Sequence, residues 1–265
     1  MNILFVGDIF GTVGKRVLAE HLEKIRAEFA IDLCIANGEN IAGGRGVTSN
    51  LVRKLYKFGV DIVTGGNHSM ADTEVYSDLY ASRSLIRPLN LPVHKPGKGQ
   101  IIHTLADGRK VAVINLMGRT FIPDETLGDP FTIGAEAVSW AKSQTPIVIV
   151  DFHAEATSEK ICLAHHLDGK ATAVLGTHTH VQTADERILP KGSAFITDVG
   201  MTGPELSAIG MKHEPIIRRY ITQEHIRFEP SSEGPMLNAV VLDINDTTGR
   251  ASSIKRILRR YPYLV

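Results

Sequence analysis

The sequence predicts an α/β fold built around a largely parallel sheet. Short, mostly apolar runs at Ile3–Val6, Leu33–Ala36 and Asp61–Thr64 are typical of buried strands. Within Val13–Phe29, apolar residues recur mostly every three or four positions, as on one face of a helix. A second helical face follows over residues 51–58 and ends at Gly59. This strand–helix–strand alternation indicates βαβ units.

The middle of the chain predicts a hairpin and then a return to alternation. The two strands of the hairpin, Ile101–Leu105 and Val111–Leu116, flank an Asp-Gly turn. A helix over Gly134–Lys142 follows, in which we expect Trp140 to anchor the core. The next expected elements are a strand ending at Phe152, a helix over residues 158–166 and a strand ending at Gly176.

The C-terminal part is predicted to be rich in strands. The stretches that indicate this are Ala194–Thr197, Ile226–Phe228, Ala239–Leu242 and Ser253–Leu258. The chain has no Gly/Ser linker, low-complexity tract or internal repeat. We therefore expect one domain over residues 1–265, with two sheets sandwiched by helices.

Composition narrows the class of protein. Hydrophobic residues make up 43% of the 265 positions, enough for a sizeable core. Lys plus Arg number 29 and Asp plus Glu number 29, so bulk charge indicates neither a nucleic-acid surface nor a membrane surface. The N-terminal apolar run is too short for a signal peptide, and no stretch is long enough to span a membrane. We expect a cytoplasmic protein.

The two cysteines, Cys34 and Cys162, form no CxxC pair. A zinc knuckle or a disulfide framework is therefore not expected. Both are predicted to be small buried hydrophobic residues.

Five of the apolar runs end in side chains that bind metals. The groups are Asp8 after residues 3–6, Glu39 and Asn40 after 33–36, Asn67 and His68 after 62–64, His153 after 147–150, and His178 and His180 after 173–175. Ligands of open α/β sheets bind beyond the carboxyl ends of the strands. If the runs are parallel strands of one sheet, the five groups meet at one rim.

The number and type of these side chains predict a centre of two ions. Without His68 there are seven candidate ligands, more than one octahedral ion accepts, so a shared carboxylate between two ions is expected. Carboxylate, amide and imidazole groups without thiolate suit Mn, Fe, Zn or Co. His178 and His180 are two positions apart, so in an extended segment they point to the same side.

A centre of two ions is suited to hydrolysis of phosphate esters, because it activates water and neutralises charge on a phosphoryl oxygen. His68 is the candidate general acid for the leaving oxygen, since Asn67 can bind metal while His68 points to substrate. General acid catalysis contributes on the order of a hundred- to ten-thousand-fold in rate.

Each candidate also has a structural alternative. Asp8 alone is consistent with a turn or a helix cap, Asn40 with a loop cap, and His153 with a hydrogen-bonded core histidine. The adjacent pair His165-His166 lies on a predicted helix and does not share a face, so we do not assign it as a ligand set. His21, His94, His103, His213 and His225 are interpreted as surface or packing residues.

Three further segments have two interpretations each. Residues 43–46 and residues 118–120 either bring backbone N–H groups and an arginine (Arg45, Arg119) to a phosphate or are surface loops. Asp198 either orients a ligating histidine or starts a turn.

These groups resemble, in order, the motif blocks of the calcineurin-like metallophosphoesterases. The blocks are Gly7-Asp8, Gly38-Glu39-Asn40, Gly66-Asn67-His68, Asp151-Phe152-His153 and residues 176–180. Residues 38–40, 151–160, 176–185 and 197–204 are more specifically similar to the bacterial YmdB-type phosphodiesterases. The resemblance extends over essentially the whole chain.

This resemblance implies a four-layer α/β/β/α sandwich of two mixed sheets that hydrolyses 2′,3′-cyclic nucleotides. It also implies a di-metal centre, most often of iron, with Mn or Zn as alternatives. By position, one ion takes Asp8, Glu39, Asn40 and His180; the other takes Glu39, Asn67, His153 and His178. Glu39 bridges the ions and His68 donates the proton.

Two positions depart from the wider superfamily. Phe10 stands where the first block usually has a histidine, and Asn40 is expected to compensate for it. Glu39 stands where the bridging residue is usually Asp. Both departures are typical of the YmdB-type branch.

Competing functions remain on the same residues. A phosphomonoesterase or an RNA-directed nuclease uses the same centre, although neutral charge does not favour long nucleic acids. A regulator that binds a nucleotide without catalysis is the non-enzymatic alternative. The sequence leaves open the physiological substrate, the metal, and whether the chain forms a homo-oligomer.

Overall fold

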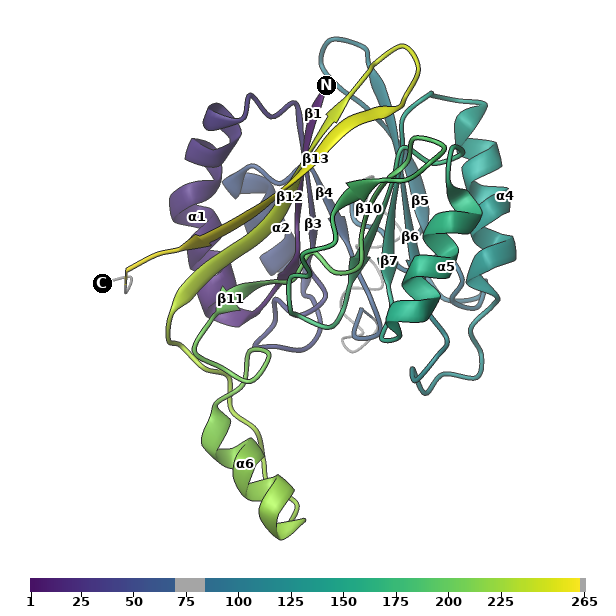
Figure 1. Cartoon of the computed structure of the whole chain (residues 1–265). Helices are drawn as coiled ribbons and strands as arrows, with labels where there is room; N and C mark the ends of the chain where they lie inside the picture. The colour runs from purple at the N-terminus through teal and green to yellow at the C-terminus, as the bar shows by residue number, and fades with distance from the viewer. Residues whose placement is uncertain (70–83, 263–265) are drawn as a thin grey trace.

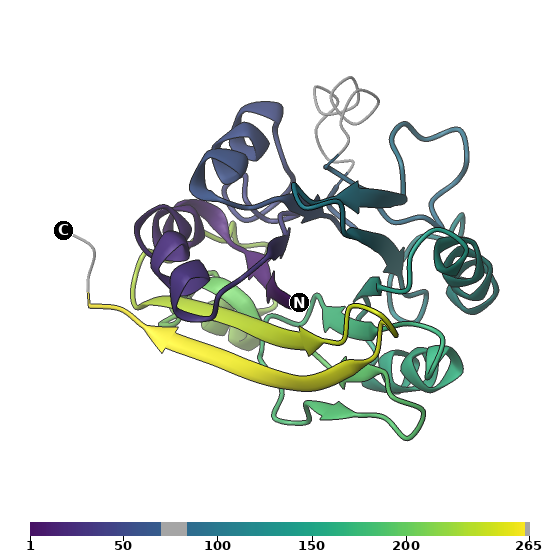
Figure 2. The same ribbon diagram turned by 90° about the horizontal axis from the view of Figure 1, so that it is seen from above.

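The computed structural model describes residues 1–69 and 84–262 and has four layers (Figure 1). Two β-sheets lie face to face, and helices cover the outer face of each (Figure 2). The predicted α/β/β/α sandwich of two mixed sheets is thereby confirmed.

The first sheet contains the N-terminal strands and the C-terminal hairpin. Its strands are β1 (Asn2–Val6), β2 (Asp8–Ile9), β3 (Leu33–Asn37), β4 (Ile62–Thr64), β11 (Met201–Pro204), β12 (Pro235–Ile244) and β13 (Ala251–Arg260). The order is β2-β11-β12-β1-β3-β4, with β13 paired to β12. Strands β1, β3 and β4 are parallel, so their carboxyl ends reach the same rim.

The second sheet contains the middle of the chain. Its strands are β5 (Gln100–Thr104), β6 (Lys110–Met117), β7 (Val148–His153), β8 (Ala173–Thr177), β9 (Arg187–Ile188) and β10 (Ala194–Ile196). The order is β5-β6-β7-β8-β10-β9, and β6, β7, β8 and β10 are parallel. Strands β5 and β6 form the predicted antiparallel hairpin.

The helices cover the two outer faces. Helices α1 (Gly11–Glu28) and α2 (Ser49–Phe58) pack on the first sheet, and α4 (Pro130–Lys142) and α5 (Thr157–Leu167) pack on the second. Helix α4 begins four residues before the predicted start, because the Asp129 side chain caps it and Pro130 occupies its first position.

Strand β1 shows why two sheets form. Its residues are buried on both faces: Leu4 and Val6 pack against the helical layer, while Ile3 and Phe5 pack toward the second sheet. Alternate side chains of a strand point to opposite faces, so a strand that is apolar throughout requires a layer on each side.

Three predictions were wrong. Residues Ile226–Phe228 form no strand, because they lie on an exposed segment without a pairing partner in the described sheets. Trp140 is not a core anchor, since it lies on the outer side of α4 and is 44% exposed. Cys162 is exposed on α5, whereas Cys34 is buried as expected.

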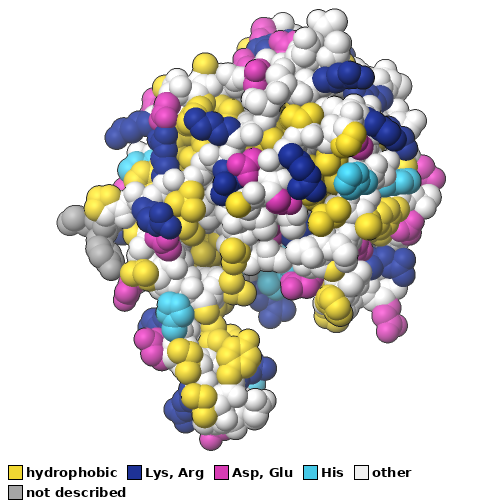
Figure 3. Space-filling view, viewed as in Figure 1, with side chains coloured by type: hydrophobic (Ala, Val, Ile, Leu, Met, Phe, Trp, Pro, Cys, Tyr) yellow, Lys and Arg dark blue, Asp and Glu magenta, His cyan; other side chains and the backbone are white. Residues whose placement is uncertain are grey.

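Helix α6 (His213–Thr222) projects from the body of the molecule as an arm and buries none of its residues (Figure 1). Hydrophobic side chains gather on this arm (Figure 3), and Ile217, Tyr220 and Ile221 are each more than half exposed. Among residues 1–69 and 84–262, no helix is long and apolar enough to cross a membrane.

Candidate metal centre

The predicted ligands come together where the parallel strands of both sheets end. Asp8 and Glu39 follow β1 and β3, and Asn67 follows β4, all in the first sheet. His153 is the last residue of β7 and pairs with Thr177, the last residue of β8, after which His178 and His180 follow. The two sheets therefore face each other across one site, with carboxylates and amides from the first and imidazoles from the second.

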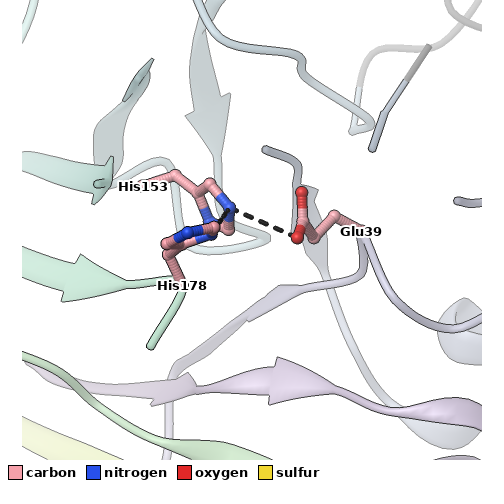
Figure 4. A group of neighbouring side chains, drawn as sticks. All are labelled: Glu39, His153 and His178. Carbon is pink, nitrogen blue, oxygen red and sulfur yellow. Dashed lines mark hydrogen bonds and ion pairs between the residues drawn. The ribbon is translucent and has the colours of Figure 1, made fainter. Parts of the chain in front are cut away.

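Four candidate ligand atoms lie close together at the centre of this site. Nε2 of His153 lies 3.2 Å from Oε1 of Glu39, 2.9 Å from Oδ1 of Asn67 and 3.0 Å from Nδ1 of His178. Figure 4 shows Glu39 and the two histidines pointing toward one another. Their ligand atoms all lie within 4.8 Å of one another, as in a metal site.

A second group of donors lies next to the first. Nδ2 of Asn40 is 2.9 Å from Oε1 of Glu39 and 3.0 Å from Nε2 of His180. His180 Nε2 lies 3.8 Å from Oδ1 of Asp8. Glu39 therefore belongs to both groups.

Asp8 provides a test of whether a metal fits. Its Oδ1 is fully buried and has no hydrogen-bond partner among the described residues, while its Oδ2 accepts the backbone N–H of His178 at 3.1 Å. A buried carboxylate oxygen without a partner is costly, and a cation relieves this cost. The donor set, oxygen and imidazole without thiolate, fits transition-metal ions.

The protonation states also favour metal binding. Burial, followed by repulsion from His153, lowers the pKa of His178 to about 3. Its Nε2 lies 2.9 Å from the carboxylate of Glu155. A neutral His178 that donates through Nε2 keeps a lone pair on Nδ1, the atom that faces the site.

The carboxylate and the other histidine carry opposite charges when no metal is present. Burial opposes ionisation of Glu39, but attraction to His153 and hydrogen bonds from His153 and His68 hold its pKa well below the usual range. Burial likewise opposes protonation of His153, but its partner Glu39 raises the pKa of this imidazole to about 9. Burial raises the pKa of Asp8.

His68 lies beside the candidate ligands. Its Nδ1 is 3.0 Å from Oδ1 of Asn40, and its backbone N–H donates to Oε2 of Glu39 at 3.0 Å. The side chain remains 30% exposed. With Nδ1–H donated to Asn40, the Nε2 atom is the one left for a substrate.

The amide of Asn40 is turned away from the predicted ligand geometry. Its oxygen faces His68 and its nitrogen faces Glu39 and His180. To bind metal through oxygen, the amide has to rotate by half a turn. In the observed orientation Asn40 instead links His68 to the site.

The argument from an extended segment was wrong for His178 and His180. Strand β8 ends at Thr177, and both histidines have left-handed backbone conformations, with φ of 102° and 67°. Between them, the backbone N–H and hydroxyl of Thr179 donate to Oδ2 of Asp198 at 3.0 and 2.7 Å. Such conformations are costly unless the surroundings hold them.

Asp198 starts a turn, one of its two interpretations, and its carboxylate also contacts Thr179, which lies between the two candidate histidines. One oxygen accepts from Thr179 and from the buried ammonium of Lys160, 2.7 Å away, and the other accepts the backbone N–H of Gly200 at 2.8 Å. Lys160 was not identified from the sequence. It lies on α5, and its side chain is 1% exposed.

Most backbone N–H groups of residues 43–46 and 118–120 already donate to other groups of the protein. In the first, the N–H groups of residues 43, 44 and 45 bond to carbonyls of residues 40–42. In the second, the N–H groups of Arg119 and Thr120 donate to the carboxylate of Glu159. Arg45 is exposed, and Arg119 lines a surface cavity of about 470 Å³ together with Phe131 and Glu159.

Phe10, at the position where the first motif block usually has a histidine, packs against the candidate ligand His180. Its ring lies edge-on to that of His180, with centroids 5.8 Å apart. The other histidines behave as packing residues where contacts are seen: His21 stacks on Tyr261 and His166 packs edge-on against Phe131.

Comparison with known proteins agrees with the fold. A crystal structure of a novel phosphatase from Mycoplasma pneumoniae is 34% identical, with a TM-score of 0.92 over 98% of this chain and 93% of that one. A hypothetical protein from Thermus thermophilus is 40% identical, with a TM-score of 0.91 over 99% and 100% of the chains. The fold is that of the metallophosphoesterase-type phosphatases, a class that implies divalent metal ions.

The family is more specific than the fold. The model of the YmdB-like protein family matches residues 4–257. The chain is 46% identical over 258 residues to the 2′,3′-cyclic-nucleotide 2′-phosphodiesterase of Bacillus subtilis (strain 168), covering 97% of each protein. The chain belongs to the YmdB-like family, and the predicted phosphodiesterase class is confirmed.

Proposed function

We propose that the chain is a di-metal phosphodiesterase that hydrolyses 2′,3′-cyclic nucleotides to nucleoside monophosphates. The observation that carries the proposal is the close approach of Glu39, Asn67, His153 and His178, beside the Oδ1 of Asp8, which has no hydrogen-bond partner among the described residues. The substrate follows from the name of the Bacillus subtilis relative, which is similar over almost the whole chain.

In this proposal the two donor groups hold one ion each. Asp8, Glu39, Asn40 and His180 hold the first, and Glu39, Asn67, His153 and His178 hold the second. The position of Glu39 in both groups supports its role as the bridge. Bound ions supply Lewis acidity, which activates water and neutralises charge on the phosphoryl group. Iron is the proposed metal, with Mn or Zn as alternatives.

His68 supplies the proton for the leaving oxygen. Its Nδ1 lies 3.0 Å from the Asn40 side chain, which fixes the ring and leaves Nε2–H of the imidazole for the ribose oxygen. Overall, the oxygen of a water bonds to phosphorus, one P–O bond of the cyclic ester breaks, and the ribose oxygen leaves with the His68 proton. One of the two water protons stays on the phosphate product. The other is released to solvent, from which His68 is protonated again.

The proposal is tested by assaying metal-loaded protein on 2′,3′-cyclic nucleotides and on a generic phosphodiester. Turnover of the cyclic nucleotides with Mn²⁺ or Fe²⁺ present is the expected result. No turnover at any near-neutral pH contradicts the proposal.

A phosphomonoesterase is the second candidate, because the Mycoplasma pneumoniae relative is described as a phosphatase. Adding nucleoside monophosphates and a short RNA to the substrate panel separates the activities. Faster release of phosphate from monoesters favours this candidate. Cleavage of RNA that weakens strongly with salt favours a nuclease, since contacts with many phosphates are salt-sensitive.

A further inference from the structure

A carboxylate that no step above uses is buried directly beneath the metal centre. Asp151 lies on β7, two residues before His153, and is completely buried. Its carboxylate accepts hydrogen bonds from the hydroxyl of Thr64, from the hydroxyl of Thr177 at 2.8 Å and from Nδ2 of Asn37 at 3.1 Å. Asp151 is therefore the common acceptor of donors from three other strands.

The three donors come from both sheets. Asn37 and Thr64 are the last residues of β3 and β4 in the first sheet, and they are paired with each other in register. Asp151 and Thr177 belong to β7 and β8 of the second sheet. The core between the two sheets consists mainly of apolar side chains such as Phe5. Asp151 therefore ties the sheets together by hydrogen bonds at the end where the ligands lie.

Two of these donors, Thr177 and Asn37, each contact a different proposed ligand. Oγ1 of Thr177 lies 3.0 Å from Nδ1 of His153. Because the Thr177 hydroxyl hydrogen points to Asp151, its oxygen accepts Nδ1–H of His153, which leaves the lone pair of Nε2 facing the site. On the other sheet, Oδ1 of Asn37 accepts the backbone N–H of Glu39 at 3.1 Å.

We propose that Asp151 is a positioning residue that holds Glu39 and His153, from opposite sheets, in register to bind the same ion. It acts through Asn37 on the first and through Thr177 on the second. A partner behind a ligating histidine fixes the ring and its tautomer.

The inference rests on the proposed function and is tested by metal binding, which does not depend on activity. The variants are Asp151→Asn, which keeps the shape but places a donor among donors, and Thr177→Val, which removes the link to His153. Thr177→Ser restores the hydroxyl. The matched control is Thr172→Val, since the Thr172 hydroxyl is also buried and hydrogen-bonded but lies before the opposite end of β8.

The experiment measures the dissociation constant of Mn²⁺ by calorimetric titration of the full chain, together with the melting temperature of each metal-free variant. We expect Asp151→Asn and Thr177→Val to weaken Mn²⁺ binding about 10- to 100-fold, as for other partners of metal ligands. Thr177→Ser recovers most of the affinity. Thr172→Val lowers the melting temperature but leaves the dissociation constant unchanged.

The outcomes separate this inference from the proposed function. If wild-type protein binds Mn²⁺ and Thr177→Val binds it equally well, the positioning role is wrong while the metal centre stands. The role is also wrong if Thr172→Val weakens binding as much as Thr177→Val. A wild-type protein that binds no metal overturns the proposed function itself.

Discussion

Replacing His68 by alanine separates the proposed proton donor from the metal ligands around it. The side chain contacts Asn40 at 3.0 Å and is 30% exposed, so water can reach the space that its removal leaves. The loss of one partly exposed hydrogen bond lowers the free energy of unfolding by about 0.5–1.5 kcal/mol. The loss of a general acid lowers turnover about 10²- to 10⁴-fold, which corresponds to about 2.7–5.5 kcal/mol in the activation free energy.

The activity loss is therefore expected to exceed the stability loss. The assay compares kcat on a 2′,3′-cyclic nucleotide, metal content and chemical denaturation for wild type and His68→Ala. His166→Ala is the control, because His166 lies on α5, packs against Phe131 of α4 and has no role in the proposed reaction. If His68→Ala loses its metal, or retains more than a tenth of wild-type kcat, the assignment of His68 as the proton donor is refuted.

Three further predictions follow from the site and its surroundings. The pKa of His153 is raised to about 9 in metal-free protein, so this histidine must lose a proton when metal binds. We therefore expect metal affinity to rise with pH and to level off near pH 9. Mn²⁺ titrations between pH 6.5 and 9 that show no rise contradict this. Lys160→Met leaves the carboxylate of Asp198 buried without its cation and lowers the free energy of unfolding by about 3–5 kcal/mol; a urea titration that shows less than about 1 kcal/mol argues against it. In native protein a thiol reagent modifies the exposed Cys162, and it reaches the buried Cys34 only after unfolding; two fast-reacting thiols contradict the structure.

The rim of ligands was predictable because it depends on local sequence and a general rule. Each ligand follows an apolar strand directly, and parallel strands end at the same edge of a sheet. That reasoning located Glu39 and His153 without any knowledge of how two sheets face each other. Its condition that the five runs belong to one sheet does not hold, because the runs are divided between two sheets that meet at the site.

The conformation of the His178–His180 turn was not predictable, because it depends on a contact distant in sequence. The Asp198 carboxylate, from the segment after β10, accepts two hydrogen bonds from Thr179. Nothing within residues 176–180 indicates this contact. Asp151 was hidden for a related reason. Within an apolar strand it shows only as one polar residue, and its partners come from three other strands.

The local sequence pattern also gave wrong predictions for one strand and for the burial of two side chains. Residues Ile226–Phe228 alternate apolar and polar side chains as a strand does, but they lie beside the projecting α6, with no sheet edge to join. Trp140 and Cys162 occupy helices with the predicted bounds to within a few residues, and each lies on the outer face of its helix. Residue type suggested burial in each case, whereas position around the helix axis determined it.

The metal content of protein purified without oxygen tests the central claim most directly. The two donor groups that share Glu39 predict about two transition-metal ions per chain. Elemental analysis of wild type, with His153→Ala measured beside it, is expected to give about two ions and about one ion, respectively. A wild-type protein that holds one ion or none, after reconstitution with excess Fe²⁺ or Mn²⁺, contradicts the di-metal account.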